Sequence, residues 1–494
     1  MNLPTSFIES TRALLGNEEY EQLAEALQQE PPTSVRLNGE KLKSGEHNVV
    51  PTINQTFHYP FSILHYPLVP WSSQGYYLNE RLTFTFDPLF HAGCYYVQEA
   101  SSMFVEQVLK QYVTKPVIML DLCAAPGGKS THARSVLPEG SLLVANEVIR
   151  NRSQILAENL TKWGHPDVVV TNNDPADFSG LSDFFDVILT DVPCSGEGMF
   201  RKDPVAIEEW SPENVEICWQ RQRRIITDIW PSLKPGGILI YSTCTYNKME
   251  DEENVNWIRE EFGAEPLPLE IQESWNITGN LIEGDESPVY HFLPHKTKGE
   301  GFFLAILRKP ETDEETSVYE TPFSKKKSKK GNMAVSIVSK ENIATAKSWL
   351  NSSEEYIIST EGNVITAFSQ AYVNELSALK QYLRVIQAGV TMGEVKGKDL
   401  IPDHSLAMSR LLKTSVFSSE EVSYNQAIAY LRKEAITLPA AASRGYVLIT
   451  YKQVPLGFVK NIGNRANNLY PQEWRIRSGY LPEKVLTLIG EDVS

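Results

Sequence analysis

The sequence predicts an α/β fold built around a mostly parallel, doubly wound sheet. From about residue 117, apolar and β-branched segments alternate with helical segments, and Gly, Pro, Asn or Asp bounds each apolar segment. The predicted strands span residues 117–123, 141–147, 168–173, 185–193 and 236–244. This alternation is typical of βαβ units, which bind ligands at the carboxyl ends of their strands.

A second strand pattern follows the parallel strands. Residues 289–295 and 301–308 are apolar segments joined by the short polar segment 296–300. Two strands with so short a connection pair in antiparallel fashion. We therefore expect a hairpin at one edge of the sheet.

Changes in composition divide the chain. Residues 7–29 have helical spacing, and a short strand pattern follows at 33–38. Near the end, 424–434 predicts a helix, and 445–451 and 455–460 predict strands. The resulting expectation is an α+β domain at 1–95, the parallel-sheet domain at 96–309, a linker at 310–333, a small α/β region at 334–415 and a strand-rich domain at 416–494.

Bulk properties narrow the class of protein. The 494 residues are 41% hydrophobic, which suits roughly three globular domains. No segment approaches the roughly 18 apolar residues that a membrane span needs, and no basic leader precedes an apolar stretch. We therefore expect a cytoplasmic protein. The net charge of −16 argues against a protein that coats nucleic acid indiscriminately.

The cysteines and histidines indicate neither a disulfide framework nor a metal site. The five cysteines are odd in number and show no CxxC spacing, and the nine histidines show no HExxH spacing. We expect free thiols and no metal.

The first parallel strand leads into a loop of small residues. The loop consists of Cys123, Ala124, Ala125, Pro126, Gly127, Gly128 and Lys129. Small residues let the backbone approach a ligand closely, and the free N–H groups of the following helix can bind a carboxylate or phosphate. Gly128-Lys129-Ser130 is similar to the end of a Walker A loop, but Cys123 stands where that motif requires Gly. The loop therefore favours a nucleotide-type ligand and disfavours an NTPase.

Acidic residues follow the next two strands. Glu147 ends the second strand, where a carboxylate can accept hydrogen bonds from ribose hydroxyls, and Asp174 follows the third, near an adenine. Either acid alone could be a helix cap. Their placement at successive strand ends favours the ligand interpretation.

The last two parallel strands each end near a cysteine. Cys194 follows Asp191 and Pro193 after the fourth strand, and Cys244 ends the fifth. A lone buried cysteine is usually an inert small hydrophobe. Two thiols at neighbouring strand ends, beside an acid, favour a chemical role. Cys94 and Cys218 lack such a setting.

These motifs closely resemble the Nop/Sun (NSUN) family of RNA cytosine-C5 methyltransferases, and the whole chain is similar to its bacterial RsmF-type members, which modify 16S rRNA. The resemblance rests on residues 123–129, 191–196 and 242–245, and extends to 95–103 and 299–303. It implies a Rossmann-like class I methyltransferase fold and the cofactor S-adenosylmethionine.

The resemblance also implies roles for individual residues. It makes Cys244 the nucleophile that adds to cytosine C6, Cys194 the residue that assists product release, and Asp191 an acid beside cofactor and base. The implied cofactor contacts are Cys123, Ala124, Ala125, Pro126, Gly127, Gly128, Lys129, Glu147, Asp174 and Asp191, with Arg152 as a further candidate.

The C-terminal residues are similar to the PUA-like RNA-binding module of RsmF-type proteins. The residues that carry this likeness are Gly457, Lys460, Gly463, Asn464, Arg465, Asn467, Asn468, Tyr470, Pro471, Trp474, Arg475 and Arg477. Guanidinium groups suit phosphate and aromatic rings suit base stacking. The alternative is a stable β-domain whose arginines bind only surface acids.

Several functions stay open. The implied partner is RNA, either 16S rRNA or the 30S subunit, while transfer RNA or 23S rRNA would suit the same chemistry. A non-catalytic ribosome-assembly factor is a third hypothesis, although such a protein needs neither Cys194 nor Cys244. DNA is disfavoured, because DNA cytosine methyltransferases take their nucleophile from the fourth-strand Pro-Cys position.

Overall fold

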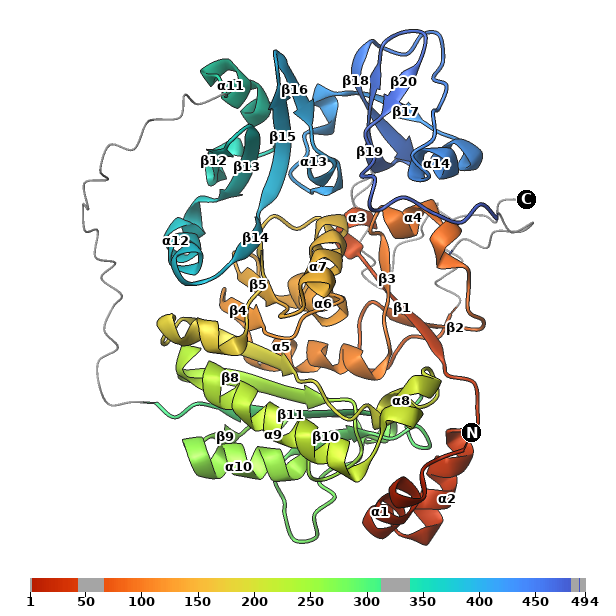
Figure 1. The fold of residues 1–494 in the computed structure, drawn as a ribbon, viewed down its shortest axis with the longest axis vertical. Coiled ribbons are helices and arrows are strands. Elements are labelled where there is room, and N and C mark those ends of the chain that lie inside the picture. Colours follow the sequence, from red (N-terminus) through yellow and green to blue (C-terminus); the bar gives the residue numbers. More distant parts are fainter. Residues whose placement is uncertain (1, 43–65, 312–337, 481–487, 489–494) are drawn as a thin grey trace.

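The computed structural model describes residues 2–42, 66–311, 338–480 and 488 (Figure 1). Its large mixed sheet has the strand order β10-β11-β8-β7-β4-β5-β6-β14, and β9 (Glu265–Pro266) also pairs with β11. The parallel strands are β4 (Ile118–Asp121), β5 (Leu142–Asn146), β6 (Val168–Thr171), β7 (Phe185–Asp191) and β8 (Leu233–Thr243). The predicted α/β fold with a mostly parallel sheet is confirmed.

Helices cover both faces of this sheet. One face packs against α5 (Val105–Tyr112), α6 (Gly128–Val136) and α7 (Arg150–Trp163). The other packs against α9 (Pro212–Ile229), α10 (Glu252–Phe262) and α12 (Val373–Tyr382), and α8 (Pro204–Glu209) precedes α9. Successive side chains such as Met119 and Leu120 therefore enter opposite hydrophobic cores. Burial on both faces explains why the strands are nearly continuous apolar segments.

The predicted hairpin forms one edge of the sheet. Strand β10 (Val289–Phe292) pairs antiparallel with β11 (Phe302–Arg308), and β11 pairs antiparallel with β8. The connection is longer than the predicted 296–300 because β10 ends at Phe292. The hairpin closes the sheet beside the strand that ends near Cys244.

The opposite edge comes from the region that the sequence places in a separate unit. Strand β14 (Val385–Ala388) pairs antiparallel with β6 and extends the large sheet. The rest of this region forms a smaller antiparallel sheet with helices. Its elements are α11 (Lys340–Ser348), β12 (Tyr356–Glu361), β13 (Val364–Ser369), β15 (Val390–Lys396), β16 (Asp399–Pro402) and α13 (His404–Met408). Most of the predicted linker 310–333 lies outside the described residues.

The N-terminal part contains two helices where the sequence pattern predicts one. Gly16, with φ of 82°, separates α1 (Thr5–Leu15) from α2 (Asn17–Ala26). A three-stranded antiparallel sheet follows, with α3 (Gly39–Leu42) and α4 (Pro88–His91). Its strands, in the order β2-β1-β3, are β1 (Thr33–Leu37), β2 (Gly75–Leu78) and β3 (Tyr95–Val97).

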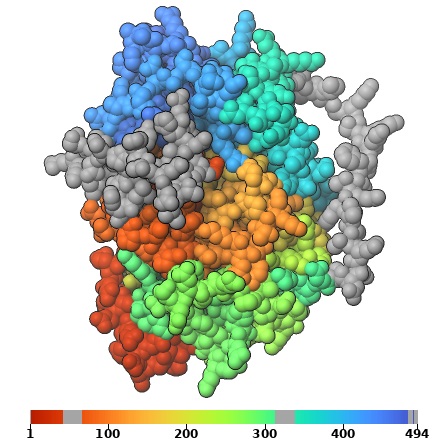
Figure 2. Space-filling view, turned by 180° about the vertical axis from the view of Figure 1, so that it is seen from behind, coloured from red at the N-terminus to blue at the C-terminus, as the bar shows by residue number. Residues whose placement is uncertain are grey.

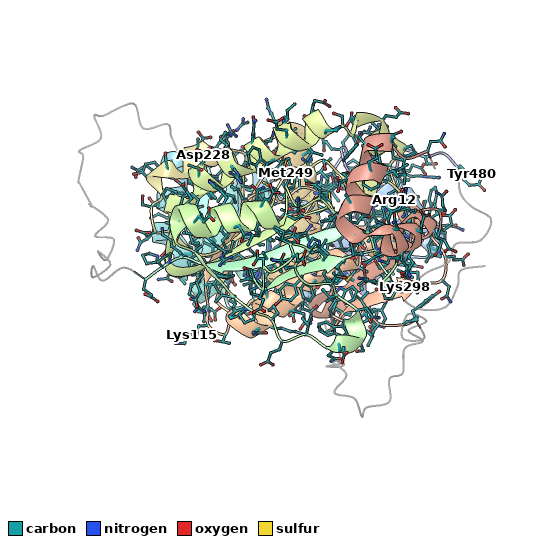
Figure 3. All side chains as sticks on the ribbon, turned by 90° about the horizontal axis from the view of Figure 1, so that it is seen from below. Arg12, Lys115, Asp228, Met249, Lys298 and Tyr480 are labelled. Atoms are coloured by element: carbon teal, nitrogen blue, oxygen red, sulfur yellow. The ribbon has the colours of Figure 1, made fainter. Side chains whose placement is uncertain are left out.

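The N-terminal helix pair packs against the large domain. Phe7 is fully buried, and its ring centroid lies 5.1 Å from that of Phe200 and 5.5 Å from that of Trp210. Tyr246, two residues after Cys244, belongs to the same core cluster. In the view from below, Arg12 marks this helix pair beside the large domain (Figure 3).

The C-terminal part is a four-stranded sheet with one helix. It comprises β17 (Ser418–Glu421), α14 (Tyr424–Leu431), β18 (Gly445–Tyr451), β19 (Val454–Asn461) and β20 (Ala466–Asn468). Its core is continuous with that of the N-terminal sheet, through Val35 and Leu37 on one side and Val447 and Ile449 on the other. Seen from behind, the blue C-terminal part lies at the end of the molecule opposite the red N-terminal helices (Figure 2). Among the helices of the described ranges, none is both long and apolar enough to cross a lipid bilayer.

The buried ring of Phe7 predicts a local loss of stability on truncation. Phe7→Ala leaves a cavity between Phe200 and Trp210, and core Phe→Ala changes cost about 3–5 kcal/mol. We expect faster hydrogen–deuterium exchange in residues 5–26 and a lower melting temperature. Ile271→Ala, at a residue that is 37% exposed, is the control and should leave both unchanged. Equal exchange in the Phe7 variant and the parent would contradict the packing role.

Candidate functional site

The candidate site lies where the strand order of the large sheet reverses. Strand β4 pairs with β5 on one side and with β7 on the other, and the chain runs outward from β4 in both directions. Ligands of doubly wound sheets bind at this switch point, outside the carboxyl ends of the strands. Asp121 ends β4 and Asp191 ends β7, so two acids border the site.

The small-residue loop connects β4 to α6 at this point. Gly127 has φ of 113°, and an added Cβ would lie 3.3 Å from Leu156 Cδ1, so the loop requires glycine there. Ser130 Oγ donates to Asp121 Oδ2 at 2.6 Å, while Asp121 Oδ1 has no hydrogen-bond partner among the described residues. Burial raises the pKa of Asp121 to about 7. A buried, unpartnered acceptor beside a glycine loop fits a ligand that supplies a donor.

The predicted ribose residue Glu147 is tied to the same loop. Its Oε1 accepts the N–H of Ile149 at 2.8 Å, and its Oε2 lies 3.3 Å from Arg152 Nη1. Arg152 Nη2 also donates to the carbonyl oxygen of Ala125 at 2.8 Å. Beside Glu147, the apolar side chains of Val148 and Ile149 are about half exposed. An acid next to an uncovered apolar surface suits a nucleoside, whose ring is apolar on its faces and whose sugar carries hydroxyls.

Asp174 has contacts that suit a helix cap. It accepts the N–H of Ala176 at 3.2 Å in a reciprocal capping arrangement with Asp177, and its Oδ2 lies 3.0 Å from Arg224 Nη2. The carboxylate is 39% exposed in this pair. Both interpretations of Asp174 stated above therefore remain compatible with its position, and its contact with an adenine stays a prediction.

The two cysteines at the strand ends lie in contact. Cys194 Sγ and Cys244 Sγ are 2.8 Å apart, and the N–H of Cys244 donates to Cys194 Sγ at 3.3 Å. The hydrogen bond with Cys244, together with burial, raises the pKa of Cys194. Cys123 lies in the glycine loop, where burial raises its pKa.

Lys129, predicted as a cofactor contact, connects the loop to the cysteine pair. Its Nζ lies 2.8 Å from Asp191 Oδ2, and Ser242 Oγ donates to Asp191 Oδ1 at 2.9 Å. Burial lowers the pKa of Lys129, but the negative charges of Asp191, Asp121 and Cys244 outweigh burial and raise it.

Three buried carboxylates lie behind the cysteines, and sequence reasoning missed all three. Glu197 follows Cys194 by three residues, and Glu250 and Asp251 follow Cys244. Asp251 Oδ1 accepts hydrogen bonds from the hydroxyls of Thr243 at 2.5 Å and Thr245 at 3.2 Å, the two neighbours of Cys244. For Glu250 and Asp251, the available signal was the acidic run at 250–253, which begins six residues after Cys244. Its partners lie in other loops and cannot be derived from spacing.

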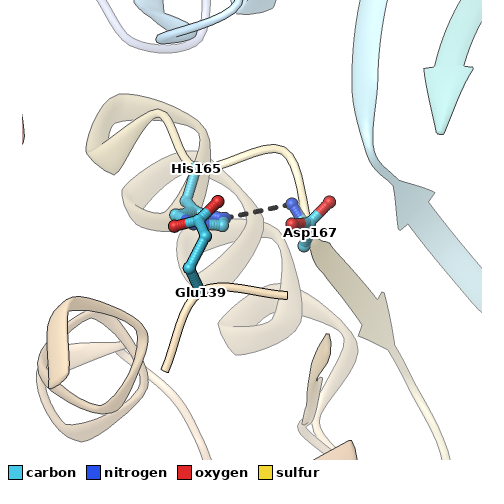
Figure 4. A group of neighbouring side chains, drawn as sticks. All are labelled: Glu139, His165 and Asp167. Atoms are coloured by element: carbon cyan, nitrogen blue, oxygen red, sulfur yellow. Dashed lines mark hydrogen bonds between the residues drawn. The ribbon is translucent and has the colours of Figure 1, made fainter. Parts of the chain in front are cut away.

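Two groups of histidine and carboxylate side chains lie outside this pair of thiols. Glu139, His165 and Asp167 come within 4.8 Å of one another (Figure 4), as do Asp251, Glu252 and His291. In the first group, Arg410 Nη2 already pairs with Glu139 at 2.6 Å, and the N–H of Asp167 donates to His165 Nδ1 at 3.1 Å. In the second, His291 Nε2 lies 2.8 Å from Glu252 Oε1. Ligand atoms stay open in both groups, because Asp167 Oδ1 in the first, and Asp251 Oδ2, Glu252 Oε2 and His291 Nδ1 in the second, have no hydrogen-bond partner among the described residues.

A cavity of about 1030 Å³ opens between the N-terminal sheet and the large domain. Its basic lining residues are Arg81, Arg201, Lys202, Lys296 and Lys298, against Glu30, Glu80 and Glu99. Arg201 also pairs with Glu300 at 3.0 Å and donates to Gly299 O. Two residues after Gly299, the backbone of Gly301 lies close to Gly198 and to Tyr246, in the loop that follows Cys244. Arg201 and Lys202, which follow the Cys194 segment in the chain, therefore connect the cavity lining to that segment.

The C-terminal residues of the PUA-like pattern differ in exposure. Asn464, Arg465 and Arg477 are exposed. Tyr470 is fully buried and its hydroxyl donates to Trp474 O. Tyr470 is thus a core residue, and the expectation that it offers a stacking surface is wrong, because its ring packs against Tyr430 and His404.

Three family models each match one part of the chain. The family model of 16S rRNA methyltransferase RsmB/F matches residues 109–308, that of the N-terminal domain of 16S rRNA methyltransferase RsmF matches 3–100, and that of the methyltransferase RsmF PUA domain matches 417–476.

Individual relatives agree with these matches. Ribosomal RNA small subunit methyltransferase F of Citrobacter koseri is 32% identical over 431 residues, covering 84% of this chain and 85% of the relative. The protein of the same name from Serratia proteamaculans is 28% identical and covers 97% of this chain and 98% of the relative. The crystal structure of PH0851, 22% identical, shares the fold over 62% of this chain and 66% of its own, with a TM-score of 0.53. The chain therefore belongs to the family of ribosomal RNA small subunit methyltransferase F, which consists of S-adenosylmethionine-dependent RNA methyltransferases.

Proposed function

We propose that this protein methylates C5 of a cytidine in 16S rRNA through a covalent bond between Cys244 Sγ and cytosine C6. The observation that carries the proposal is the contact between two thiols, 2.8 Å apart, beside the switch point of the sheet. Membership of the family supports an RNA substrate, and the names of the relatives in Citrobacter and Serratia favour small-subunit rRNA. A ribosomal substrate also accords with the cytoplasmic location that the sequence predicts.

Cys244 would begin the reaction by making C5 nucleophilic. C5 of cytosine is too weak a nucleophile to accept a methyl group directly. When the thiolate of Cys244 adds to C6, an S–C6 bond forms and the electrons of the C5–C6 double bond become available at C5. Lys129, whose Nζ lies 2.8 Å from Asp191 Oδ2, would hold that carboxylate beside the reacting cysteine. S-adenosylmethionine, when bound, supplies the methyl group that C5 accepts.

Cys194 would complete the reaction by taking the C5 proton. While Cys244 is free, its hydrogen bond to Cys194 raises the pKa of Cys194, so Cys194 keeps its proton. Once Cys244 is bonded to C6, this hydrogen bond is lost, and Cys194 would release its own proton to solvent and then act as a thiolate base. Removal of the C5 proton re-forms the C5–C6 double bond, breaks the S–C6 bond and returns Cys244 as a thiolate.

Asp191 would orient the base. Its carboxylate is held by Lys129 and Ser242 next to the cysteine pair, and a carboxylate accepts hydrogen bonds. The N4 amino group of cytosine could donate a hydrogen bond to this carboxylate. This arrangement would favour cytosine over uracil, which presents a carbonyl oxygen there.

The cofactor would occupy the switch point beside the glycine loop. We assign its contacts to residues 123–129 and to Glu147, with Asp174 and Asp191 at the margins of the site. The unpartnered Asp121 Oδ1 and the uncovered Val148 and Ile149 support a nucleoside ligand at this place.

The RNA would contact the parts outside the large sheet. We propose that residues 1–95 and 416–494, whose sheets share one core, bind RNA beside the methyltransferase domain at 96–309. The exposed Arg465 and Arg477 and the basic lining of the cavity support this. Local basic surfaces are required because the chain as a whole carries a net charge of −16.

Cysteine variants test the chemistry. Cys244→Ala should abolish methyl transfer with little loss of stability, because the nucleophile is gone. Cys194→Ala should form the bond to C6 but fail to break it, so a protein–RNA adduct should accumulate on a denaturing gel. Methylation that survives in Cys244→Ala, or an adduct that needs Cys194, would reverse the assigned roles.

A methyl-transfer assay tests the substrate. Tritiated S-adenosylmethionine is incubated with unmodified 30S subunits, 16S rRNA, 23S rRNA or transfer RNA, with Cys244→Ala as the control, and labelled RNA is sequenced after bisulfite treatment. We expect Cys244-dependent label at C5 of a cytosine in a 16S sample. Label confined to transfer RNA or 23S rRNA would support the proposed chemistry but show that 16S rRNA is not the substrate. Absence of label in every RNA would favour a non-catalytic assembly role.

Gly127→Ala tests the cofactor loop. A Cβ at a φ of 113° strains the loop and would contact Leu156, and a left-handed conformation costs a non-glycine residue roughly 1–2 kcal/mol. We expect weaker binding of S-adenosylhomocysteine by isothermal titration calorimetry. Gly16→Ala is the matched control, because Gly16 also has positive φ but no atom within 4 Å of its added Cβ. Equal affinity in both variants would argue against the loop as the binding site.

A further inference from the structure

The loops that carry the two cysteines are joined by reciprocal carboxylates. Glu197, in the Cys194 loop, accepts the backbone N–H of Tyr246 at 2.7 Å and that of Asn247 at 3.1 Å, both in the Cys244 loop. Trp210 Nε1 and Asn247 Nδ2 donate to its other oxygen at 3.0 and 3.1 Å. One loop thus supplies the acceptor and the other supplies the backbone donors.

Glu250 makes the same kind of contact in the opposite direction. It lies in the Cys244 loop, and its Oε2 accepts the backbone N–H of Ser195, the residue after Cys194, at 3.0 Å. Gln222 Nε2, from α9, donates to the same oxygen at 2.7 Å, and Asn247 Nδ2 donates to Oε1 at 2.9 Å. A third link is the N–H of Gly198, which donates to the carbonyl oxygen of Cys244 at 2.8 Å.

The burial of these two carboxylates is costly, so their placement requires an explanation. Glu197 is 2% exposed and Glu250 is fully buried. In the described ranges their hydrogen-bond donors are uncharged amide and indole N–H groups. Burial raises the pKa of Glu197 to about 7, and burial also raises the pKa of Glu250. Apolar side chains would fill this space at lower cost, but they could not hold backbone N–H groups from a second loop.

We propose that Glu197 and Glu250 are positioning residues that hold Cys194 within reach of the cytosine bonded to Cys244, and that they thereby control release of the methylated RNA. The inference rests on the proposed function. Each glutamate fixes the backbone beside the other loop's cysteine, so the pair sets the separation of the two thiols. Addition of Cys244 to C6 needs only the Cys244 loop, whereas removal of the C5 proton needs both loops in register. Loss of one carboxylate should therefore slow release more than addition.

Glu250→Gln is the first test. The glutamine amide keeps one acceptor oxygen, but its NH₂ group would face N–H groups that now donate to Glu250, so at least one of those hydrogen bonds is lost. Loss of a hydrogen bond to a charged group should lower the rate of adduct breakdown by about tenfold or more. This rate is measured by quenching single-turnover reactions and separating the adduct on a denaturing gel. Formation of the adduct should change by less than about threefold, because Cys244, Lys129 and Asp191 are untouched. Glu197→Gln is the second variant, and it should likewise slow adduct breakdown more than adduct formation.

The matched control is Glu252→Gln. Glu252 is also buried and lies two residues further along the chain, but it contacts His291 and the N–H of Leu281 rather than the Cys194 loop. We expect this variant to lose stability without accumulating adduct. Accumulation of adduct in Glu252→Gln to the level of Glu250→Gln would reduce the effect to general loosening of the domain and overturn the proposal.

The double variant Cys194→Ala/Glu250→Gln tests whether Glu250 acts by positioning Cys194 or by a separate effect on the reaction. If Glu250 acts through Cys194, the double variant should break down its adduct no more slowly than Cys194→Ala alone, because coupled residues are not additive. A further slowing would overturn the inference. If Cys194→Ala accumulates adduct but both glutamate variants slow addition and release equally, the positioning role of the glutamates is overturned while the proposed function stands. Absence of adduct in Cys194→Ala itself would overturn the proposed function.

Discussion

The parallel register of β7 and β8 is the constraint on which the candidate site depends. Hydrogen bonding places Asp191 opposite Ser242, so Cys194 and Cys244, three and two residues beyond these positions, leave neighbouring strands side by side. Side chains alternate faces along a strand, and a slip by one residue would reverse which face each one meets. Such a slip would move the side chains of β7 and β8 into the core on the opposite face and separate Asp191 from the thiols. The cores on both faces of the sheet therefore maintain the geometry at its end.

Beyond the strand ends, polar contacts replace packing as the source of order. The Cys194 and Cys244 loops contain too few apolar residues to fix each other by burial, and buried backbone N–H groups need partners. Glu197 and Glu250 supply those partners from within the two loops, and Asp251 accepts hydrogen bonds from the hydroxyls of Thr243 and Thr245. The N-terminal helices add a hydrophobic support, because Tyr246 packs in the cluster that contains Phe7. Loops held in this way can place reactive groups closely without regular secondary structure.

Patterns that are local in sequence predicted the fold well, and patterns that depend on distant partners did not. The parallel strands are continuous apolar segments bounded by turn residues because they are buried on both faces. The hairpin β10–β11 is likewise short-range. By contrast, the pairing of β14 with β6 joins segments far apart in the chain and leaves no periodic signal. The break at Gly16 was missed because one glycine within a helical pattern indicates a break only weakly.

The same distinction applies to the site. Cys194, Cys244 and the glycine loop stand in motifs, whereas the contacts of Lys129 with Asp191 and of Glu250 with Ser195 arise only when separate loops meet. Arg36 is a further case. This N-terminal residue is 1% exposed, its Nη2 donates to Thr131 Oγ1 in α6 at 2.7 Å, and its Nε donates to Gln98 Oε1 at 2.8 Å. Burial lowers the pKa of Arg36 to about 9, so keeping this charge costs stability. The cost is offset only while the N-terminal sheet stays docked on the helix that follows the cofactor loop, which makes the two parts one rigid unit at the site.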